Sequence, residues 1–204
     1  MEQTTTAPVE APRRKSAGRW KLFAVIAVCA SPMIASYLTY YVIKPEGRTN
    51  YGDFIDPRAH PIPPLKSVGL DGKPLALDAY RGKWVMLLVN SADCDEACQQ
   101  KLYAMRQLRL TTGKEMSRVE RVWLVTDKEP VETILLRQYD GMHLLRADPD
   151  AVARWLPADA GTKPSEHLYM IDPLGNLMMR FPKDPDLNKV KKDLNKLLKA
   201  SRIG

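Results

Sequence analysis

Residues 84–98 read Trp-Val-Met-Leu-Leu-Val-Asn-Ser-Ala-Asp-Cys-Asp-Glu-Ala-Cys. The apolar run over 84–89 is typical of a strand buried on both faces of a sheet. A short polar loop follows, and apolar residues then recur at helical spacing over about 96–112. The segment therefore predicts a strand that leads into a helix, with Cys94 and Cys98 where the two elements meet.

The remainder of the chain alternates between strand and helix patterns. We expect a strand over 119–125, a helix over about 130–139, a strand over 142–145, a helix from Asp148-Pro149 to Trp155, two tightly joined strands over 167–171 and 177–181, and a final amphipathic helix. This order predicts an α/β fold in which helices cover both faces of a mixed sheet. With the cysteine pair at the end of the first buried strand, the domain resembles a thioredoxin-like domain.

The N-terminal part of the chain has the features of a membrane anchor. Residues 22–43 carry no charged side chain, and this length is sufficient to span a bilayer. Basic residues precede it within residues 1–21, so the positive-inside rule places this tail in the cytoplasm. A cleaved signal peptide is the alternative, but its apolar core is usually shorter, and no small-x-small cleavage site follows here. We predict a single-pass protein of the inner membrane whose domain lies on the periplasmic (non-cytoplasmic) side.

Composition divides the chain into four parts. We expect a basic cytoplasmic tail over 1–21, a transmembrane anchor over 22–43, a proline-rich tether over 44–64 and one thioredoxin-like domain over 65–204. The formal charge of +7 comes from the tail and from the last helix, because acidic and basic residues balance over 22–182. The charge therefore reflects membrane topology and a helical surface, and we expect no binding of nucleic acid.

The cysteine pair has three candidate roles outside the cytosol: a structural disulfide, a redox-active dithiol and a site for a soft metal. A structural bridge across so short a loop would constrain the unfolded chain little. A dithiol oxidoreductase is expected to carry Cys-x-x-Cys, whereas one additional residue separates Cys94 from Cys98. Asp93, Asp95 and Glu96 also disfavour a second negative charge on a thiol. The pair is better suited to holding a cation, and thiolates select Cu(I).

A copper site on the cysteine pair needs a third ligand from elsewhere in the fold. Imidazole completes copper(II)-thiolate sites, so a histidine is the candidate for this ligand. The chain has three histidines. His60 lies in the proline-rich tether, and His143 opens a strand. His167 directly precedes a strand that we expect beside the thiol loop, so it is the candidate third ligand. A histidine at the start of a strand can equally be structural, and this alternative stays open.

Three motifs and the N-terminal anchor are similar to the Sco/SenC family. The motifs are Cys-x-x-x-Cys after a buried strand, Val-Thr-Asp-Lys-Glu-Pro at 125–130 and Ile-Asp-Pro-Leu-Gly at 171–175. The resemblance covers about residues 65–200. It implies a membrane-tethered thioredoxin-like factor that delivers copper to subunit II of cytochrome c oxidase or reduces its cysteines. It also implies that the two motif cysteines, here Cys94 and Cys98, bind copper.

The resemblance also implies a distant histidine ligand. Counted back from the Asp-Pro-Leu-Gly turn, that position falls near Pro164, three residues before His167. Asp95 stands where the family usually has a proline after the first cysteine. Either His167 substitutes as the ligand, or the third ligand is lost, which would favour a redox role for the cysteine pair.

Three functions follow from these observations. The first is a metallochaperone for copper, as Cu(I) or Cu(II), which transfers the metal to a cytochrome c oxidase subunit by thiolate ligand exchange. The second is a thiol–disulfide reductase, in which Cys94 and Cys98 would be catalytic and act on the cysteines of a partner. The third is a non-catalytic docking scaffold for oxidase assembly.

Overall fold

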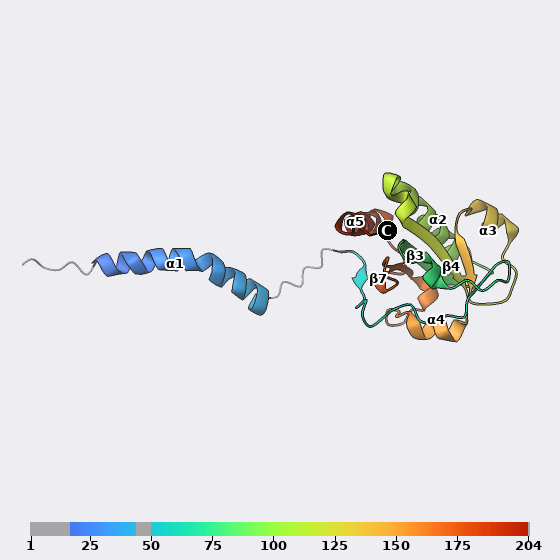
Figure 1. Cartoon of the computed structure of the whole chain (residues 1–204), viewed down its shortest axis with the longest axis horizontal. Coiled ribbons are helices and arrows are strands. Elements are labelled where there is room, and N and C mark those ends of the chain that lie inside the picture. Colours follow the sequence, from blue (N-terminus) through green and yellow to red (C-terminus); the bar gives the residue numbers. More distant parts are fainter. Residues whose placement is uncertain (1–16, 44–49, 204) are drawn as a thin grey trace, which may run out of the picture. The chain divides into compact units, whose positions relative to one another are not determined.

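The structure is a computed structural model that describes residues 17–43 and 50–203 (Figure 1). Most of the predicted cytoplasmic tail, the first part of the predicted tether and Gly204 lie outside the described residues. The chain forms two units, which divide between Arg48 and Thr49. We describe each unit by itself.

The described part of the N-terminal unit, residues 17–43, is helical. It comprises α1 (Ala17–Leu38) and a π-helical turn, η1 (Thr39–Ile43). The span from Gly18 to Ile43 is long and apolar enough to cross a membrane, with a mean hydropathy of 1.9. The prediction of one candidate membrane-spanning helix is confirmed, although the helix begins several residues earlier than expected.

The second unit contains a seven-stranded mixed sheet. Its order is β1-β7-β6-β3-β4-β5-β2. The central strands β3, β4 and β5 are parallel to one another, and the remaining pairs are antiparallel. The strands are β1 (Asp53–Phe54), β2 (Val68–Gly69), β3 (Trp84–Asn90), β4 (Val119–Val125), β5 (His143–Arg146), β6 (Leu168–Ile171) and β7 (Leu177–Phe181). This architecture confirms the predicted mixed α/β fold.

Helices cover both faces of the sheet (Figure 1). On one face lie α2 (Glu96–Thr111) and α5 (Leu187–Ala200), and on the other lies α4 (Pro149–Trp155). The short helix α3 (Thr133–Gln138) precedes β5. Three 3₁₀ turns complete the domain: η2 (Leu77–Tyr80), η3 (Gly113–Arg118) and η4 (Pro164–Glu166).

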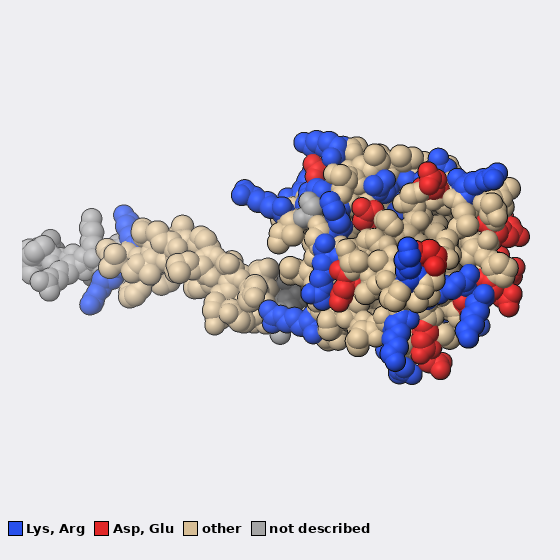
Figure 2. All heavy atoms as spheres, turned by 45° about the vertical axis from the view of Figure 1, so that its right-hand side comes forward, with Lys and Arg blue, Asp and Glu red and all other residues tan. Residues whose placement is uncertain are grey.

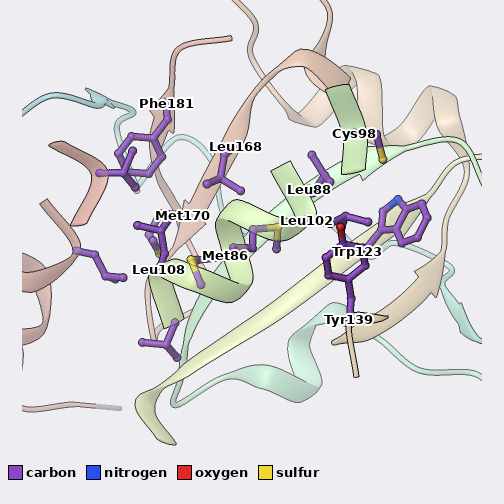
Figure 3. Packing of buried hydrophobic residues seen from close by; sticks show 14 of the residues in the cluster. Met86, Leu88, Cys98, Leu102, Leu108, Trp123, Tyr139, Leu168, Met170 and Phe181 are labelled. Atoms are coloured by element: carbon purple, nitrogen blue, oxygen red, sulfur yellow. The ribbon is translucent and has the colours of Figure 1, made fainter. Parts of the chain in front are cut away.

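Two hydrophobic clusters fill the space between the sheet and these helices. Successive strand residues point to opposite faces, so Met86 and Leu88 of β3 pack in the cluster beneath α2, with Leu102 (Figure 3). Leu87 packs in the cluster on the α4 side, with Val152 of α4. We refer to these as the α2-side and α4-side clusters. The alternation of side chains between the two faces also decides which residues at the ends of the strands lie on the same face of the sheet.

The segment predicted as a tether differs from the expectation in its described part. Residues 53–54 form β1, which pairs with β7 at the edge of the sheet. Ile55 is buried and its N–H bonds to the carbonyl of Met178, and Pro61 forms an isolated bridge with Asn176. Proline is compatible with edge positions of a sheet because only one side of an edge strand is paired. A proline-rich composition therefore did not distinguish a free tether from an edge segment.

Charged side chains are interspersed on the face of the domain shown in Figure 2. Lysine and arginine side chains alternate there with aspartate and glutamate. Such mixing keeps a surface soluble without creating a field of a single sign.

Candidate functional site

Cys94 and Cys98 form a disulfide where β3 leads into α2. Cys94 lies in the loop after β3, and Cys98 lies in the first turn of α2. Their Cα atoms are 5.1 Å apart. The structure therefore brings the two predicted site cysteines together in an oxidised pair.

Asp95, which separates Cys94 from the helix, is the N-cap of α2. Its Oδ1 accepts the backbone N–H of Cys98 at 2.9 Å. A carboxylate at this position satisfies an N–H that lacks an intrahelical partner and interacts favourably with the positive end of the helix dipole. Asp95 thus has a structural reason to stand at this position, and its carboxyl group lies beside the sulfur pair.

Two further side chains hold the loop over 91–95, and neither was predicted from the sequence. Asp127 Oδ2 accepts the N–H of Ala92 at 3.0 Å, and Gln99 Nε2 donates to the carbonyl of Cys94 at 3.1 Å. Asp127 follows β4, the parallel neighbour of β3, so the loops after these strands meet at one edge of the sheet. An expected pairing of these two strands could have identified Asp127 from the sequence as a neighbour of the cysteine loop.

The backbone at Cys94 is in the left-handed region, with φ +36°. Among the described residues it is the only non-glycine residue with positive φ. For an L-residue this conformation costs about 1–2 kcal/mol, so it persists only where the surrounding structure enforces it. The disulfide, the bond from Gln99 and the N-cap at Asp95 together supply such constraints.

The sulfur pair is covered in this state. Both cysteines are 0% exposed and belong to the α2-side cluster, and Figure 3 shows Cys98 at the edge of that cluster. A cavity of about 550 Å³ opens beside the first turn of α2, but neither cysteine lines it. An incoming thiol or metal ion therefore reaches the sulfurs only if the loop over 91–95 moves.

His167, the candidate third ligand, lies on the other side of the sheet. The residue is 0% exposed. Its Nδ1 donates to the carbonyl of Phe181 at 2.9 Å, since a carbonyl can only accept, and its Nε2 lies 2.6 Å from the Thr162 hydroxyl. The ring centre is 6.2 Å from that of Tyr169, a member of the α4-side cluster.

The alternation of side chains explains this placement. Along β6, Leu168 packs in the α2-side cluster with the two cysteines, whereas Tyr169 packs on the α4 side. His167, one residue before Leu168, shares the face of Tyr169. The structure does not bring His167 to the sulfurs. Ligation of copper by His167 stays a prediction, and it requires the ring to leave the Phe181 carbonyl and the Thr162 hydroxyl.

The segment just before His167 does lie at the thiol end of the sheet, because η4 contacts both β3 and α2. Pro164, at the position that the family resemblance assigns to a ligand, begins this turn and has no donor atom in its side chain. The other histidines have different partners: His60 Nδ1 lies 3.2 Å from the Asp56 carbonyl, and His143 Nε2 lies 3.3 Å from Glu120.

These contacts define what the site can hold. Within residues 17–43 and 50–203, no three histidine, cysteine or carboxylate side chains gather as a metal site. The donor set that the structure provides is the sulfur pair, which becomes two thiols on reduction. Soft thiolate ligands of this kind suit Cu(I).

Comparisons with known proteins agree with this architecture. The family described as the transmembrane-like, thioredoxin-like, C-terminal domain matches residues 84–201, and the transmembrane-like, N-terminal domain matches residues 12–42. No curated protein matches the chain.

Solved structures of similar fold include ScoI from Bradyrhizobium japonicum with copper bound, at 17% identity and a TM-score of 0.51, covering 66% of this chain and 98% of that one. BsSco, a Sco-family cytochrome c oxidase assembly protein with a disulfide switch, has 15% identity and a TM-score of 0.52, covering 72% and 98%. The thioredoxin domain of a thiol-disulfide oxidoreductase from Bacteroides vulgatus has 15% identity and a TM-score of 0.50, covering 68% and 95%. At these identities the likeness shows the fold, which is thioredoxin-like.

Proposed function

This chain belongs to the family of transmembrane-like proteins with a thioredoxin-like C-terminal domain, and we propose that it is a Sco-like factor of respiratory oxidase assembly that carries Cu(I) on Cys94 and Cys98. The observation that carries the proposal is the position of the pair. Cys94, in the loop after β3, and Cys98, in the first turn of α2, are joined in a disulfide at the junction where the thioredoxin-like fold presents its thiol chemistry.

The chemistry of the pair favours a soft cation over a nucleophilic thiolate. Asp93 and Asp95 flank Cys94, and the carboxylate of Asp127 bonds to the same loop. Negative charge nearby opposes a free thiolate but lowers the free energy of a bound cation. The two thiolates supply the soft ligands that select Cu(I).

The redox state of the pair would control loading. In the disulfide, each sulfur is bonded to the other and neither is a thiolate ligand. A dithiol reductant supplies two electrons and two protons, breaks the S–S bond and leaves two thiols. Binding of Cu(I) then displaces the thiol protons, since the thiolate is the form that binds metal.

Delivery would proceed by ligand exchange. A thiolate of the acceptor forms a bond to Cu(I) as the bond from Cys94 or Cys98 breaks, so copper is not released into solution. We propose a cytochrome c oxidase subunit, subunit II, as the acceptor. The basic residues before the uncharged stretch 22–43 favour a cytoplasmic tail, and the domain and its acceptor would then lie on the periplasmic side.

A transfer experiment tests this mechanism. The Cu(I)-loaded full-length protein in detergent is mixed with a synthetic peptide that carries two cysteines, and copper on the peptide is followed with time. Ligand exchange predicts a transfer rate that rises in proportion to the peptide concentration. A rate that is independent of peptide concentration would mean that copper dissociates first, and it would contradict the proposed delivery.

The disulfide favours thiol–disulfide reduction as a second candidate function. A redox site needs only the two sulfurs, and no third metal ligand lies beside them among residues 17–43 and 50–203. In that case a Cys98→Ser variant should accumulate a mixed disulfide between Cys94 and a partner peptide, because the resolving thiol is absent. Absence of that adduct under oxidising conditions would exclude the reductase.

A further inference from the structure

Arg121 occupies a position that the strand pattern reserves for apolar residues. Val119 and Trp123 on either side of it along β4 pack in the α2-side cluster, and the period of two places Arg121 on the same face. The residue is only 4% exposed. A charge buried without a counter-charge is costly, so its presence here needs an explanation.

Arg121 lines a cavity together with two other arginines. The cavity has a volume of about 210 Å³. Arg106 and Arg109 are three residues apart on α2 and therefore lie on the same side of that helix. Leu110, Met116 and Asp140 complete the lining. Three cationic groups thus face one carboxylate.

Backbone carbonyl groups orient all three arginines. Arg106 Nη1 donates to Gln138 at 2.8 Å, Arg109 Nε donates to Val119 at 2.6 Å, and Arg121 Nη2 donates to Asp140 at 2.7 Å. Carbonyl groups carry no net charge, so these bonds fix the guanidinium groups without neutralising them.

The donors of Arg121 are not all used. Its Nε and Nη1 are buried and have no hydrogen-bond partner. The one acidic side chain of the cavity, Asp140, is exposed, and its Oδ1 accepts the N–H of Gly141 at 2.8 Å. Arg121, a lining residue of the cavity, therefore has buried donors that lack an acceptor, which in folded proteins marks a place for a missing water, ion or ligand.

The charges around Arg121 have the same consequence. Burial, and then the like charges of Arg109 and Arg106, hold the pKa of Arg121 below its ordinary value, while Glu120 and Asp140 act in the opposite direction. Burial first, and then the neighbouring cations, therefore disfavour the charged form of Arg121. An anion in the cavity would offset this effect.

We propose that the cavity formed by Arg106, Arg109 and Arg121 binds a phosphate-type oxyanion. The planar guanidinium offers paired N–H donors that match the oxygens of phosphate, and the cavity volume fits a small anion or the phosphate group of a larger molecule. The source is either free phosphate or a phosphate ester such as a lipid headgroup. This site is built on the far half of α2 from the cysteines and is independent of the copper proposal.

Thermal unfolding of the full-length protein in non-ionic detergent tests the inference, with inorganic phosphate titrated against sodium chloride at constant ionic strength. A ligand that binds only the folded state raises Tm with its concentration. We expect a Tm that rises with phosphate in the wild-type protein and in Arg154→Gln, an exposed arginine on α4 that serves as the control. We expect no phosphate-dependent rise in Arg121→Met.

Arg121→Met has a second readout. Because the variant removes an unneutralised buried charge, its Tm without phosphate should equal or exceed that of the wild-type protein, whereas a purely structural arginine would give a lower Tm. If the variant does not fold, Arg106→Gln replaces it, since Arg106 is exposed, and should weaken phosphate binding by about tenfold. An equal rise in the wild-type and Arg121→Met proteins, or no rise in the wild-type protein beyond that with chloride, overturns the inference.

Three additional ligands identify the source. Glycerol 3-phosphate in place of inorganic phosphate tests for a monoester, and a short-chain phosphatidylglycerol tests for the diester of a lipid headgroup. A rise in Tm with either one, lost in Arg121→Met, supports the phosphate class and names its form. An equal rise with succinate would overturn the phosphate assignment, because it would show that the cavity accepts any carboxylate.

Discussion

Replacing Cys94 or Cys98 with serine is expected to abolish the binding of Cu(I) by the reduced full-length protein. A hydroxyl oxygen is a hard ligand and a poor substitute for a thiolate, so each variant retains a single soft ligand. The reduced wild-type protein is the matching reference, because none of the three samples then contains the disulfide. The measurement is a Cu(I) titration in competition with a chromophoric chelator, under strictly reducing conditions.

The chain supplies its own control for this experiment. Cys29 is the remaining cysteine of the chain and is a free, exposed residue of α1. Cys29→Ser should retain the copper stoichiometry and affinity of the wild-type protein. If Cys94→Ser also retained both, copper would be bound elsewhere and the proposed function would be wrong.

The second large effect is expected at His167 and concerns stability. His167→Ala removes a buried ring, leaves the Phe181 carbonyl without its donor and leaves the Thr162 hydroxyl without its ring partner. The combined loss of contacts and of satisfied polar groups should lower the free energy of unfolding by about 2–4 kcal/mol. Urea unfolding of the reduced full-length protein, followed by tryptophan fluorescence, measures the change.

Copper binding by the same variant separates the structural role from the ligand role. The structure predicts that His167→Ala keeps its Cu(I) affinity wherever it is folded. His60→Ala, a change at a half-buried loop residue, is the control for both measurements and should shift the unfolding free energy by less than about 0.5 kcal/mol. Weakened copper binding together with unchanged stability would establish His167 as the third ligand.

Local signals in the sequence were sufficient for the central elements of the fold. The apolar run at 84–89 and the helical spacing after Glu96 predicted β3 and α2, and the strand expected over 119–125 coincides with β4. Such patterns work because a strand buried on both faces leaves few alternatives for a short apolar run. The junction between β3 and α2 then fixed the position of the cysteine pair.

The environment of the pair depends on contacts that a single sequence does not report. His167 directly precedes β6, as expected, but the sequence alone did not indicate which face of the sheet its side chain takes. A shift of one residue along a strand moves a side chain to the opposite face, and only the register of β6 against β3 decides it. The position equivalent to the family ligand, Pro164, does reach the thiol end through η4.

The cavity lined by Arg106, Arg109 and Arg121 could not be predicted from the sequence either, because it also depends on contacts between elements. Arg106 and Arg109 look like ordinary solvated residues on a helix, and Arg121 looks like a polar interruption of a strand. Their convergence depends on how α2 crosses β4, which brings Arg109 to the carbonyl of Val119. Charge clustering of this kind is a property of packing between elements and not of any one element.

We propose that the Cys94–Cys98 pair switches between a disulfide and a dithiol and that the dithiol form alone holds copper. The most direct measurement counts the Cu(I) bound by one preparation of the full-length protein before and after reduction of the disulfide, with the thiols titrated in parallel. We expect no tightly bound copper before reduction and a single ion per chain afterwards. Equal copper binding in the two states would contradict this proposal.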